Sequence, residues 1–278
     1  MGCALGGTVG AVRPVTGGDL NLAFRMVVDG HPVFVKTAPD TSAEASSAFP
    51  GEAAGLLWLA EPGALPVPAV LAVTERFLAL QWVEPGPSRG AATEEELGRG
   101  LAAVHAAGAP AYGGAHVLRL GPLALADGPA ESWAACFAQQ RLEPLIGRAL
   151  DLGRVDPAGA AALVRVCERM DTLAGPPEPP ARVHGDLWSG NVHVDRDGRP
   201  WLVDPAAHGG HREVDLAMLR LFGGMSERCF SAYEEVAPLA DGHRERVTLW
   251  QLFPLLVHAV LFGGGYGARA TEIARRLA

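Results

Sequence analysis

The sequence predicts an α+β protein of two lobes: a small lobe of antiparallel strands with one helix, and a larger, mainly helical lobe. Residues 10–83 alternate apolar and polar side chains as strands do, whereas helical spacing dominates the rest. The break Glu84-Pro85-Gly86 separates the two patterns. We therefore expect one lobe at residues 1–83 and another at residues 84–278, with a ligand cleft between them.

The first lobe contains a predicted hairpin and a predicted helix. In LAFRMVVDGHPVFVKT, residues 22–37, the turn signal Asp29-Gly30 separates two strand-like runs. A helix is expected at EAAGLLWLA, residues 52–60, because its apolar residues recur at helical spacing. The lobe is completed by two more strand-like runs, PAVLAV at residues 68–73 and RFLALQWV at residues 76–83.

The second lobe reads as helices around one strand-rich segment. TEEE at residues 93–96 carries a capping-box signature for the first helix. The second predicted helix covers residues 131–150, and the third begins at Asp156-Pro157, an N-cap followed by proline. The stiff connector GPPEPP follows, and helical patterns return beyond residue 212.

Charge and cysteine content restrict the classes of function. The net charge is −8 and no run of basic residues is present, so we do not expect a nucleic-acid partner. The cysteines are widely separated and form no Cys-x-x-Cys pair, which favours isolated reduced thiols over disulfides or zinc. They are Cys3, Cys136, Cys167 and Cys229.

No segment predicts secretion or membrane attachment. The N-terminal residues lack the basic and apolar regions of a signal peptide, and Gly6 stands where a myristoylation motif needs Ser or Thr. The most apolar stretch, residues 249–262, is too short to cross a bilayer and contains Gln251 and Pro254. We interpret it as a buried helix and expect a cytoplasmic protein with no membrane partner.

The most informative stretch is HGDLWSGNVHVDRDGRPWLVD. Its second half predicts a β-hairpin with the turn Asp197-Gly198. A hairpin brings its ends together, so Asn191 at the entry and Asp204 at the exit become neighbours. Asp186 lies shortly before Asn191, in a glycine-containing loop.

These three residues fit one kind of chemistry. A carboxylate and an amide oxygen are hard ligands suited to Mg²⁺, and a second carboxylate can accept a hydroxyl proton. Asp-x4-Asn followed by Asp after a short hairpin is the arrangement used in protein-kinase-like phosphoryl transfer. The alternative is a surface hairpin with capping Asp and Asn side chains, and for Asp186 taken alone that alternative stays open.

Other parts of a nucleotide site can be sought upstream. Lys36 ends a strand and Glu52 starts the following helix, the order in which an ATP-orienting Lys–Glu pair occurs; an exposed hairpin lysine is the alternative. Gly17 and Gly18 occupy the slot of a phosphate-covering loop. The strand end before the break is placed to meet adenine, and its residues are Gln81, Trp82 and Val83.

At this point the chain resembles the fructosamine kinases, or ketosamine-3-kinases, relatives of the aminoglycoside phosphotransferases with a protein-kinase-like fold. HGD-x4-N marks the wider superfamily, and HGDLWSGN together with DPA is narrower. The resembling segments spread over most of the chain and are GGDLN, FVK, EAAGLLWL, HGDLWSGN, LVDPA, GHREVDLAML, LFGG and LFGGGY.

The resemblance implies a role for each matching residue. Asp186 would be the proton acceptor, Asn191 and Asp204 would bind Mg²⁺, and Lys36 paired with Glu52 would orient ATP. Gln81 to Val83 would match the adenine-binding hinge.

Further matches and departures concern the loop and the acceptor. Asp215 would brace the catalytic loop. Trp188 is either a platform for the sugar or packing beneath the loop. Some relatives carry a regulatory cysteine in the glycine loop, where this chain has Asp19, and an Asn-Phe-Ile-Gly-like run expected early in the helical lobe is missing.

We therefore interpret the chain as a kinase that moves the γ-phosphate of ATP to the 3-hydroxyl of a free or protein-linked fructosamine- or ribulosamine-type ketosamine, a deglycation repair reaction by resemblance. Its cofactors would be ATP and Mg²⁺, and a monomer is favoured. Two alternatives stay open: an aminoglycoside- or choline-type small-molecule phosphotransferase, and a nucleotide-binding pseudokinase.

Overall fold

The computed structural model describes residues 6–15, 21–38, 48–86, 89–114 and 117–278. Its N-terminal part is a five-stranded antiparallel sheet in the order β1-β2-β3-β5-β4, with one helix, α3 (Ala48–Ala60), beside it. The strands are β1 (Val9–Val15), β2 (Leu22–Val28), β3 (His31–Thr37), β4 (Val70–Val73) and β5 (Phe77–Gln81).

The hairpin predicted between β2 and β3 is confirmed. Val28 pairs with His31, and the two turn residues between them, Asp29 and Gly30, have φ angles of 48° and 83°. Positive φ at both positions is what a two-residue hairpin turn requires, and Asp-Gly adopts it readily. The turn chemistry therefore sets the register that carries Lys36 to the far end of β3.

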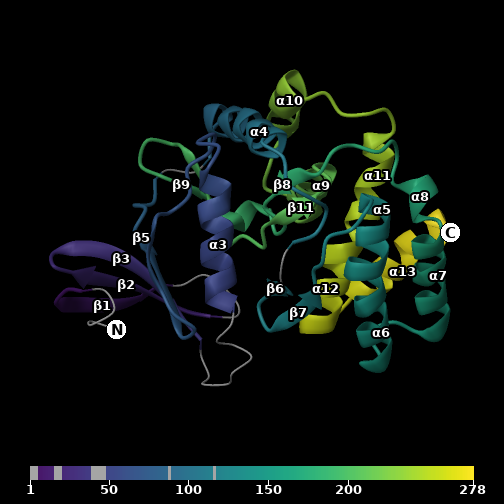
Figure 1. Ribbon diagram of the computed structural model, residues 1–278, viewed down its shortest axis with the longest axis horizontal. Coiled ribbons are helices and arrows are strands. Elements are labelled where there is room, and N and C mark those ends of the chain that lie inside the picture. Colours follow the sequence, from purple (N-terminus) through teal and green to yellow (C-terminus); the bar gives the residue numbers. More distant parts are fainter. Residues whose placement is uncertain (1–5, 16–20, 39–47, 87–88, 115–116) are drawn as a thin grey trace.

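Helix α3 packs against one face of the sheet. Buried Phe49, Ala53 and Leu56 lie at spacings of three and four and form a cluster with Leu78 and Leu80 of β5. The helix stands between the sheet and the larger part of the molecule (Figure 1).

The C-terminal part is mainly helical and lies on the other side of α3 in Figure 1. It holds the largest hydrophobic cluster, which centres on side chains such as Phe137, Trp250 and Leu255. Its helices are α4 (Ala91–Ala106), α5 (Trp133–Cys136), α6 (Glu143–Asp151), α7 (Pro157–Glu168), α8 (Met170–Leu173), α9 (Glu213–Leu221), α10 (Glu227–Val236), α11 (His243–Trp250), α12 (Leu252–Phe262) and α13 (Tyr266–Leu277).

Three short two-stranded sheets lie within the C-terminal part. Their strands are β6 (Val117–Leu120) with β7 (Leu123–Ala126), β8 (Ala181–Val183) with β11 (His208–Gly210), and β9 (Val192–Val194) with β10 (Pro200–Leu202). The last two sheets lie between the large sheet and the helices (Figure 1). The fold is thus an antiparallel N-terminal sheet joined to a helical region, as the sequence predicted.

Three of the predicted helices differ in detail from those in the structure. Helix α4 begins at Ala91 with Gly90 as N-cap, so Thr93 is the third helical residue; its hydroxyl accepts from the Gly90 N–H (3.4 Å) and donates to the Gly198 carbonyl (2.7 Å). The helix predicted at 131–150 contains one π-helical turn, Phe137–Leu142. The apolar stretch at 249–262 is divided between α11 and α12 at Gln251.

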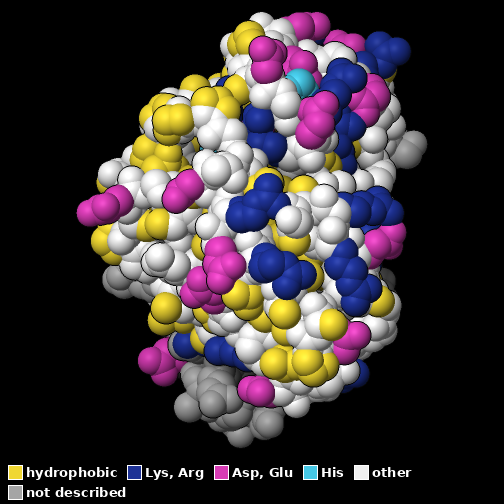
Figure 2. Space-filling view, turned by 90° about the vertical axis from the view of Figure 1, so that its right-hand side faces the viewer, with side chains coloured by type: hydrophobic (Ala, Val, Ile, Leu, Met, Phe, Trp, Pro, Cys, Tyr) yellow, Lys and Arg dark blue, Asp and Glu magenta, His cyan; other side chains and the backbone are white. Residues whose placement is uncertain are grey.

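The outer face of the helical region carries many arginines. Figure 2 shows dark blue side chains across this face, with acidic side chains beside several of them. No helix of the described residues is both long enough and apolar enough to cross a membrane.

Candidate active site

The β9–β10 hairpin positions two of the predicted site residues. Trp201 pairs with His193, as predicted for the run ending at Asp204. Leu202 pairs with Val192 next, and beyond that pair the backbone N–H of Val203 donates to the Asn191 carbonyl (3.1 Å). The hairpin thus closes between Asn191 and Asp204, and Asp204 has a positive φ of 56°, which is uncommon for a residue other than glycine.

Asn191 also holds the loop that carries Asp186. The Nδ2 atom of Asn191 donates to the backbone carbonyl of Asp186 (2.8 Å) and to its Oδ2 atom (3.2 Å). With its nitrogen used in this way, the atom that Asn191 can offer a metal is Oδ1. Burial and the nearby charge of Asp204 raise the pKa of Asp186 to about 8, against the lowering effect of the Asn191 bond.

Lys36 joins the sheet to this hairpin. Its Nζ atom lies 2.9 Å from Glu52 Oε1 and 2.5 Å from Asp204 Oδ1, although 168 positions separate it from Asp204. Burial acts to lower the pKa of Lys36, but the two carboxylates outweigh it and raise the pKa. Burial also raises the pKa of Glu52 to about 6 despite the opposing charge of Lys36. The exposed-lysine alternative is excluded, because Lys36 is 7% exposed.

The composition of the chain also singles out this lysine, independently of any motif. Lys36 is the only lysine of the chain, and the other 22 of its 23 basic residues (23 − 1) are arginines. Arginine replaces lysine readily on a solvated surface, whereas a compact ammonium between two carboxylates is a different group from a planar guanidinium. The one lysine of the chain thus lies at a buried position where a compact ammonium contacts two carboxylates.

Asp215 holds the backbone that leads into Asp186. Its carboxylate accepts the N–H groups of His184 (2.7 Å) and Gly185 (2.9 Å) and lies 3.1 Å from His105 Nε2. Burial opposes its ionisation, yet these hydrogen bonds lower the pKa of Asp215. Gly185 has a φ of 81°, and a Cβ there would lie 2.1 Å from the Ala206 carbonyl oxygen, so only glycine fits.

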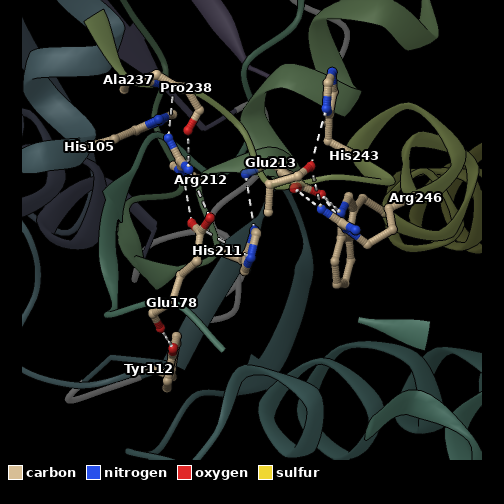
Figure 3. A network of polar contacts seen from close by, with 12 residues as sticks. His105, Tyr112, Glu178, His211, Arg212, Glu213, Ala237, Pro238, His243 and Arg246 are labelled. Carbon is tan, nitrogen blue, oxygen red and sulfur yellow. Dashed lines mark hydrogen bonds and ion pairs between the residues drawn. The ribbon is translucent and has the colours of Figure 1, made fainter. Parts of the chain in front are cut away.

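The segment before α9 anchors this loop to the helical region. Figure 3 shows Arg212 and Glu213 directed to different partners. Glu213 accepts from Arg246 through two nitrogens (2.9 and 2.6 Å), and Arg212 donates to Glu178 through two nitrogens (2.6 and 2.8 Å). Paired bonds of this kind fix orientation as well as position.

The remaining predicted nucleotide-site residues are those of the phosphate-covering loop and the adenine-binding strand end. Gly17 and Gly18 lie outside the described residues. Gln81 is exposed and its Oε1 accepts from the Ala69 N–H (3.3 Å), while Trp82 Nε1 donates to Glu84 (2.9 Å). The carbonyl of Val83 lies 3.1 Å from His193 Nε2. The last contact ties the predicted hinge to the β9–β10 hairpin.

A pocket beside Asp186 opens into the helical region. It encloses about 500 Å³, counting its solvent-open part, and Asp186 is one of its lining residues. Trp188 does not line it. This residue is 39% exposed, and its ring packs edge-on against Phe222 with 6.2 Å between the ring centroids and covers Gly190. Sequence reasoning missed several of the residues that line it, namely Trp133, Phe137, Arg141, His208, Trp250, Phe253 and His258.

A signal for one of these residues exists in the sequence. Phe137, Arg141 and Leu145 are spaced four apart, so Arg141 lies on the apolar stripe of its predicted helix. A charged residue on such a stripe is buried against the core, and burial of a charge requires a compensating function or partner.

Comparison with known proteins agrees with this site. The sequence description of the fructosamine kinase family matches residues 6–278. The chain belongs to the fructosamine kinase family. This confirms the resemblance and the predicted enzyme class, a phosphotransferase, and membership of a kinase family implies the use of ATP.

Relatives of this family cover nearly the whole chain. The Thermus thermophilus protein named "Probable ketoamine kinase" is 38% identical over 92% of this chain and 90% of its own. The Arabidopsis thaliana chloroplastic protein-ribulosamine 3-kinase is 32% identical over 94% of this chain and 81% of its own. The predicted fructosamine or ribulosamine kinase function agrees with these names.

Solved structures confirm the predicted fold. A Thermobifida fusca crystal structure assigned as a fructosamine-3-kinase has a TM-score of 0.91 and 42% identity, covering 99% of this chain and 96% of that one. The aminoglycoside phosphotransferase APH(4)-Ia has a TM-score of 0.62 at 19% identity, over 98% of this chain and 95% of that one, which shows a shared fold.

Proposed function

We propose that this chain transfers the γ-phosphate of ATP to the 3-hydroxyl of a fructosamine- or ribulosamine-type ketosamine. The observation that carries the proposal is the joining of Lys36 to Glu52 and Asp204, next to a hairpin that leads back to Asp186 at the pocket. The names of the relatives, ketoamine kinase and protein-ribulosamine 3-kinase, support the choice of acceptor. The lobes would be residues 1–83 for ATP and 84–278 for the acceptor.

Asp186 would act on the acceptor hydroxyl. Its carboxylate lines the pocket and is oriented by Asn191, so a hydroxyl in the pocket can donate a hydrogen bond to it. The carboxylate would hold that proton as the oxygen attacks, and positioning would supply much of the rate. Asp215 would keep the loop in place through the N–H groups that it binds.

The residues present fit Mg²⁺ bound together with a nucleotide. Within the described residues, no group of three His, Cys, Asp or Glu side chains gathers to hold a metal alone. Mg²⁺ commonly uses one or two protein oxygens and completes its shell with phosphates and water. Asp204 and Asn191 would supply those oxygens, and the cation that contacts the Asp204 carboxylate in this structure is the Lys36 ammonium.

ATP and Mg²⁺ would supply the phosphoryl group and neutralise its charge, as in other kinases. Lys36, held by Glu52, would contact the α- and β-phosphates, and Gly17 and Gly18 would cover them. The backbone of Gln81, Trp82 and Val83 would bind adenine.

The pocket favours a neutral acceptor over a polycation. Its charged lining among the described residues is Asp186, Asp215 and Arg141, and the carboxylate of Asp215 is already used by backbone N–H groups. An aminoglycoside site would be lined by several free acids. A pseudokinase is disfavoured because Lys36 and the three oxygen-bearing site residues are all in place.

The test is Mg²⁺-dependent ATP consumption over a panel of ketosamines, aminoglycosides and choline. We expect turnover with ketosamines, and a loss of roughly two or more orders of magnitude in Asp186→Asn with ATP binding retained. The exposed turn variant Asp197→Asn is the matched control. Turnover near the wild-type rate in Asp186→Asn, or turnover only with aminoglycosides, would contradict the proposal.

The nucleotide site can be tested separately, because the chain has one lysine. An ATP derivative that carries an amine-reactive acyl phosphate should acylate Lys36, giving one mass increment beyond any on the N-terminal amine, and excess ATP should prevent it. Acylation that ATP leaves unchanged would place the nucleotide elsewhere.

A further inference from the structure

The acceptor pocket has a second polar region besides Asp186. Trp133, Arg141 and His208 line the pocket and are 4%, 1% and 4% exposed. Within the described part of the chain, Trp133 Nε1, Arg141 Nε and NH1, and His208 Nε2 have no hydrogen-bond partner. Buried polar atoms without partners are rare and costly, so four of them on one pocket indicate a ligand.

Arg141 is held in place by the surrounding structure. One of its nitrogens, NH2, forms an ion pair with Asp127, which neutralises its charge. Gly128, the residue after Asp127, is held by Gln140, whose side chain accepts the Gly128 N–H (2.9 Å) and donates to the Gly128 carbonyl (3.0 Å). Arg141 also lies in the π-helical turn Phe137–Leu142, a feature often found at functional sites.

His208 presents a hydrogen-bond acceptor. Its Nδ1 atom lies 2.9 Å from the Ala206 carbonyl, which can only accept, so Nδ1 carries the proton. Burial, with the charge of Arg141, lowers the pKa of His208 to about 4, so the ring is neutral and Nε2 keeps its lone pair. The ring stacks on Trp133 at 6.2 Å, and a Cβ at Gly185 would lie 3.0 Å from its Cε1. This region is therefore next to the residue that precedes Asp186.

We propose that Trp133, Arg141 and His208 form a hydroxyl-binding subsite that selects the sugar chain of the acceptor. The subsite offers N–H donors from Trp133 and Arg141 and one acceptor from His208. The hydroxyls of a sugar chain can satisfy this set together, because each donates one hydrogen bond and accepts up to two.

Charged ligands fit this subsite less well. A carboxylate or phosphate only accepts and would face the lone pair of His208, and Asp127 has already neutralised Arg141. An ammonium only donates and would meet a guanidinium. The proposal of this subsite rests on the proposed function. The subsite would bind the sugar at hydroxyl groups other than the one that receives the phosphate.

Two matched changes test it, one in the protein and one in the acceptor. Arg141→Lys keeps a cation for Asp127 but removes both unpartnered nitrogens, and Arg148→Lys, at an exposed position of α6, is the control. The acceptors are an N-substituted 1-amino-1-deoxyfructose and its 5-deoxy and 6-deoxy counterparts. The readouts are kcat/KM, and binding by calorimetry without ATP.

We expect wild type and Arg148→Lys to prefer the full sugar over one deoxy counterpart by about ten- to hundredfold, the value of a hydrogen bond to a charged group. In Arg141→Lys and in His208→Phe this preference should fall to less than about threefold. A residue that only supports the fold would lower kcat/KM for every acceptor by the same factor, leaving the preference intact. That result, or no preference in wild type, would overturn the subsite.

The binding measurement separates this proposal from the proposed function. Wild type that binds the full sugar more tightly than its deoxy counterparts, yet transfers no phosphate to it, would contradict the function and support the subsite. Phosphate transfer to full and deoxy sugars at equal efficiency would support the function and contradict the subsite. Binding of none of the three sugars would overturn the subsite as well.

Discussion

Replacing Asp215 should destabilise the fold and disorder the loop that leads to Asp186. Asp215 is 1% exposed, and Asp215→Ala would leave the N–H groups of His184 and Gly185 and the Nε2 atom of His105 without their partner. Each such buried group costs about 1–3 kcal/mol, and a water in the vacated space offsets part of the sum. We expect a loss of about 3 kcal/mol in the free energy of unfolding, below the 5–15 kcal/mol of a typical domain, so the variant stays folded.

Asp215→Asn distinguishes the effect of Asp215 on the position of the catalytic loop from its effect on the stability of the fold. Its side chain keeps the shape and one acceptor oxygen, but its NH₂ group would face an N–H donor, so at least one of the two backbone bonds is lost. We expect a stability loss of about 1–3 kcal/mol together with a fall in kcat of roughly a hundredfold, because a displacement of about 1 Å near the chemistry has that effect.

Urea unfolding followed by circular dichroism gives the stabilities, with an unchanged m-value as the condition for comparison. Asp197→Asn, in the exposed hairpin turn, should stay within about 0.5 kcal/mol of wild type. If Asp215→Ala matched wild type in both stability and kcat, the three contacts described here would not support the loop, and the reasoning would be refuted.

Two further predictions concern buried charge. Glu213→Ala should cost about 3–5 kcal/mol because it leaves buried Arg246 without its ion-pair partner, whereas Arg99→Ala, in an exposed pair, should leave the free energy of unfolding close to that of wild type. Equal losses in urea unfolding would contradict this. His208 has a pKa lowered to about 4, so stability should not depend on it above its unfolded pKa of about 6.5 and should fall below that. The expected fall is about 2 kcal/mol from pH 7 to 5, and an equally steep pH profile in His208→Gln would rule out this assignment.

Local chemistry was sufficient for part of the fold. The β2–β3 and β9–β10 hairpins follow from Asp-Gly turns, which act within a few residues. The N-cap at Asp156 was predictable for the same reason, since its side chain accepts the Gly159 N–H three residues later. The start of the first helix in the larger part was misplaced because Thr93 closes the cap from within the helix, three residues after Gly90, and its hydroxyl also binds the distant β9–β10 hairpin.

Part of the candidate site could likewise be predicted from the sequence, and part of it depends on tertiary packing. The residue types and spacing of Asp186, Asn191 and Asp204 predict phosphoryl transfer because a hairpin must bring its own ends together. The uniqueness of Lys36 is also a fact of sequence. Its contact with Asp204 is not, because it depends on how the sheet docks against a hairpin 168 positions away.

The acceptor pocket depends on tertiary packing most of all. His208 is far from Trp133 and Arg141 in the sequence, and a buried arginine on an apolar stripe is compatible with a purely structural ion pair. Only the folded chain shows that Asp127 takes one of its nitrogens and leaves two others facing no described partner. Side-chain direction and long-range packing decide this, and neither is encoded in local spacing, so the chemistry could be predicted from the sequence but the acceptor selectivity could not.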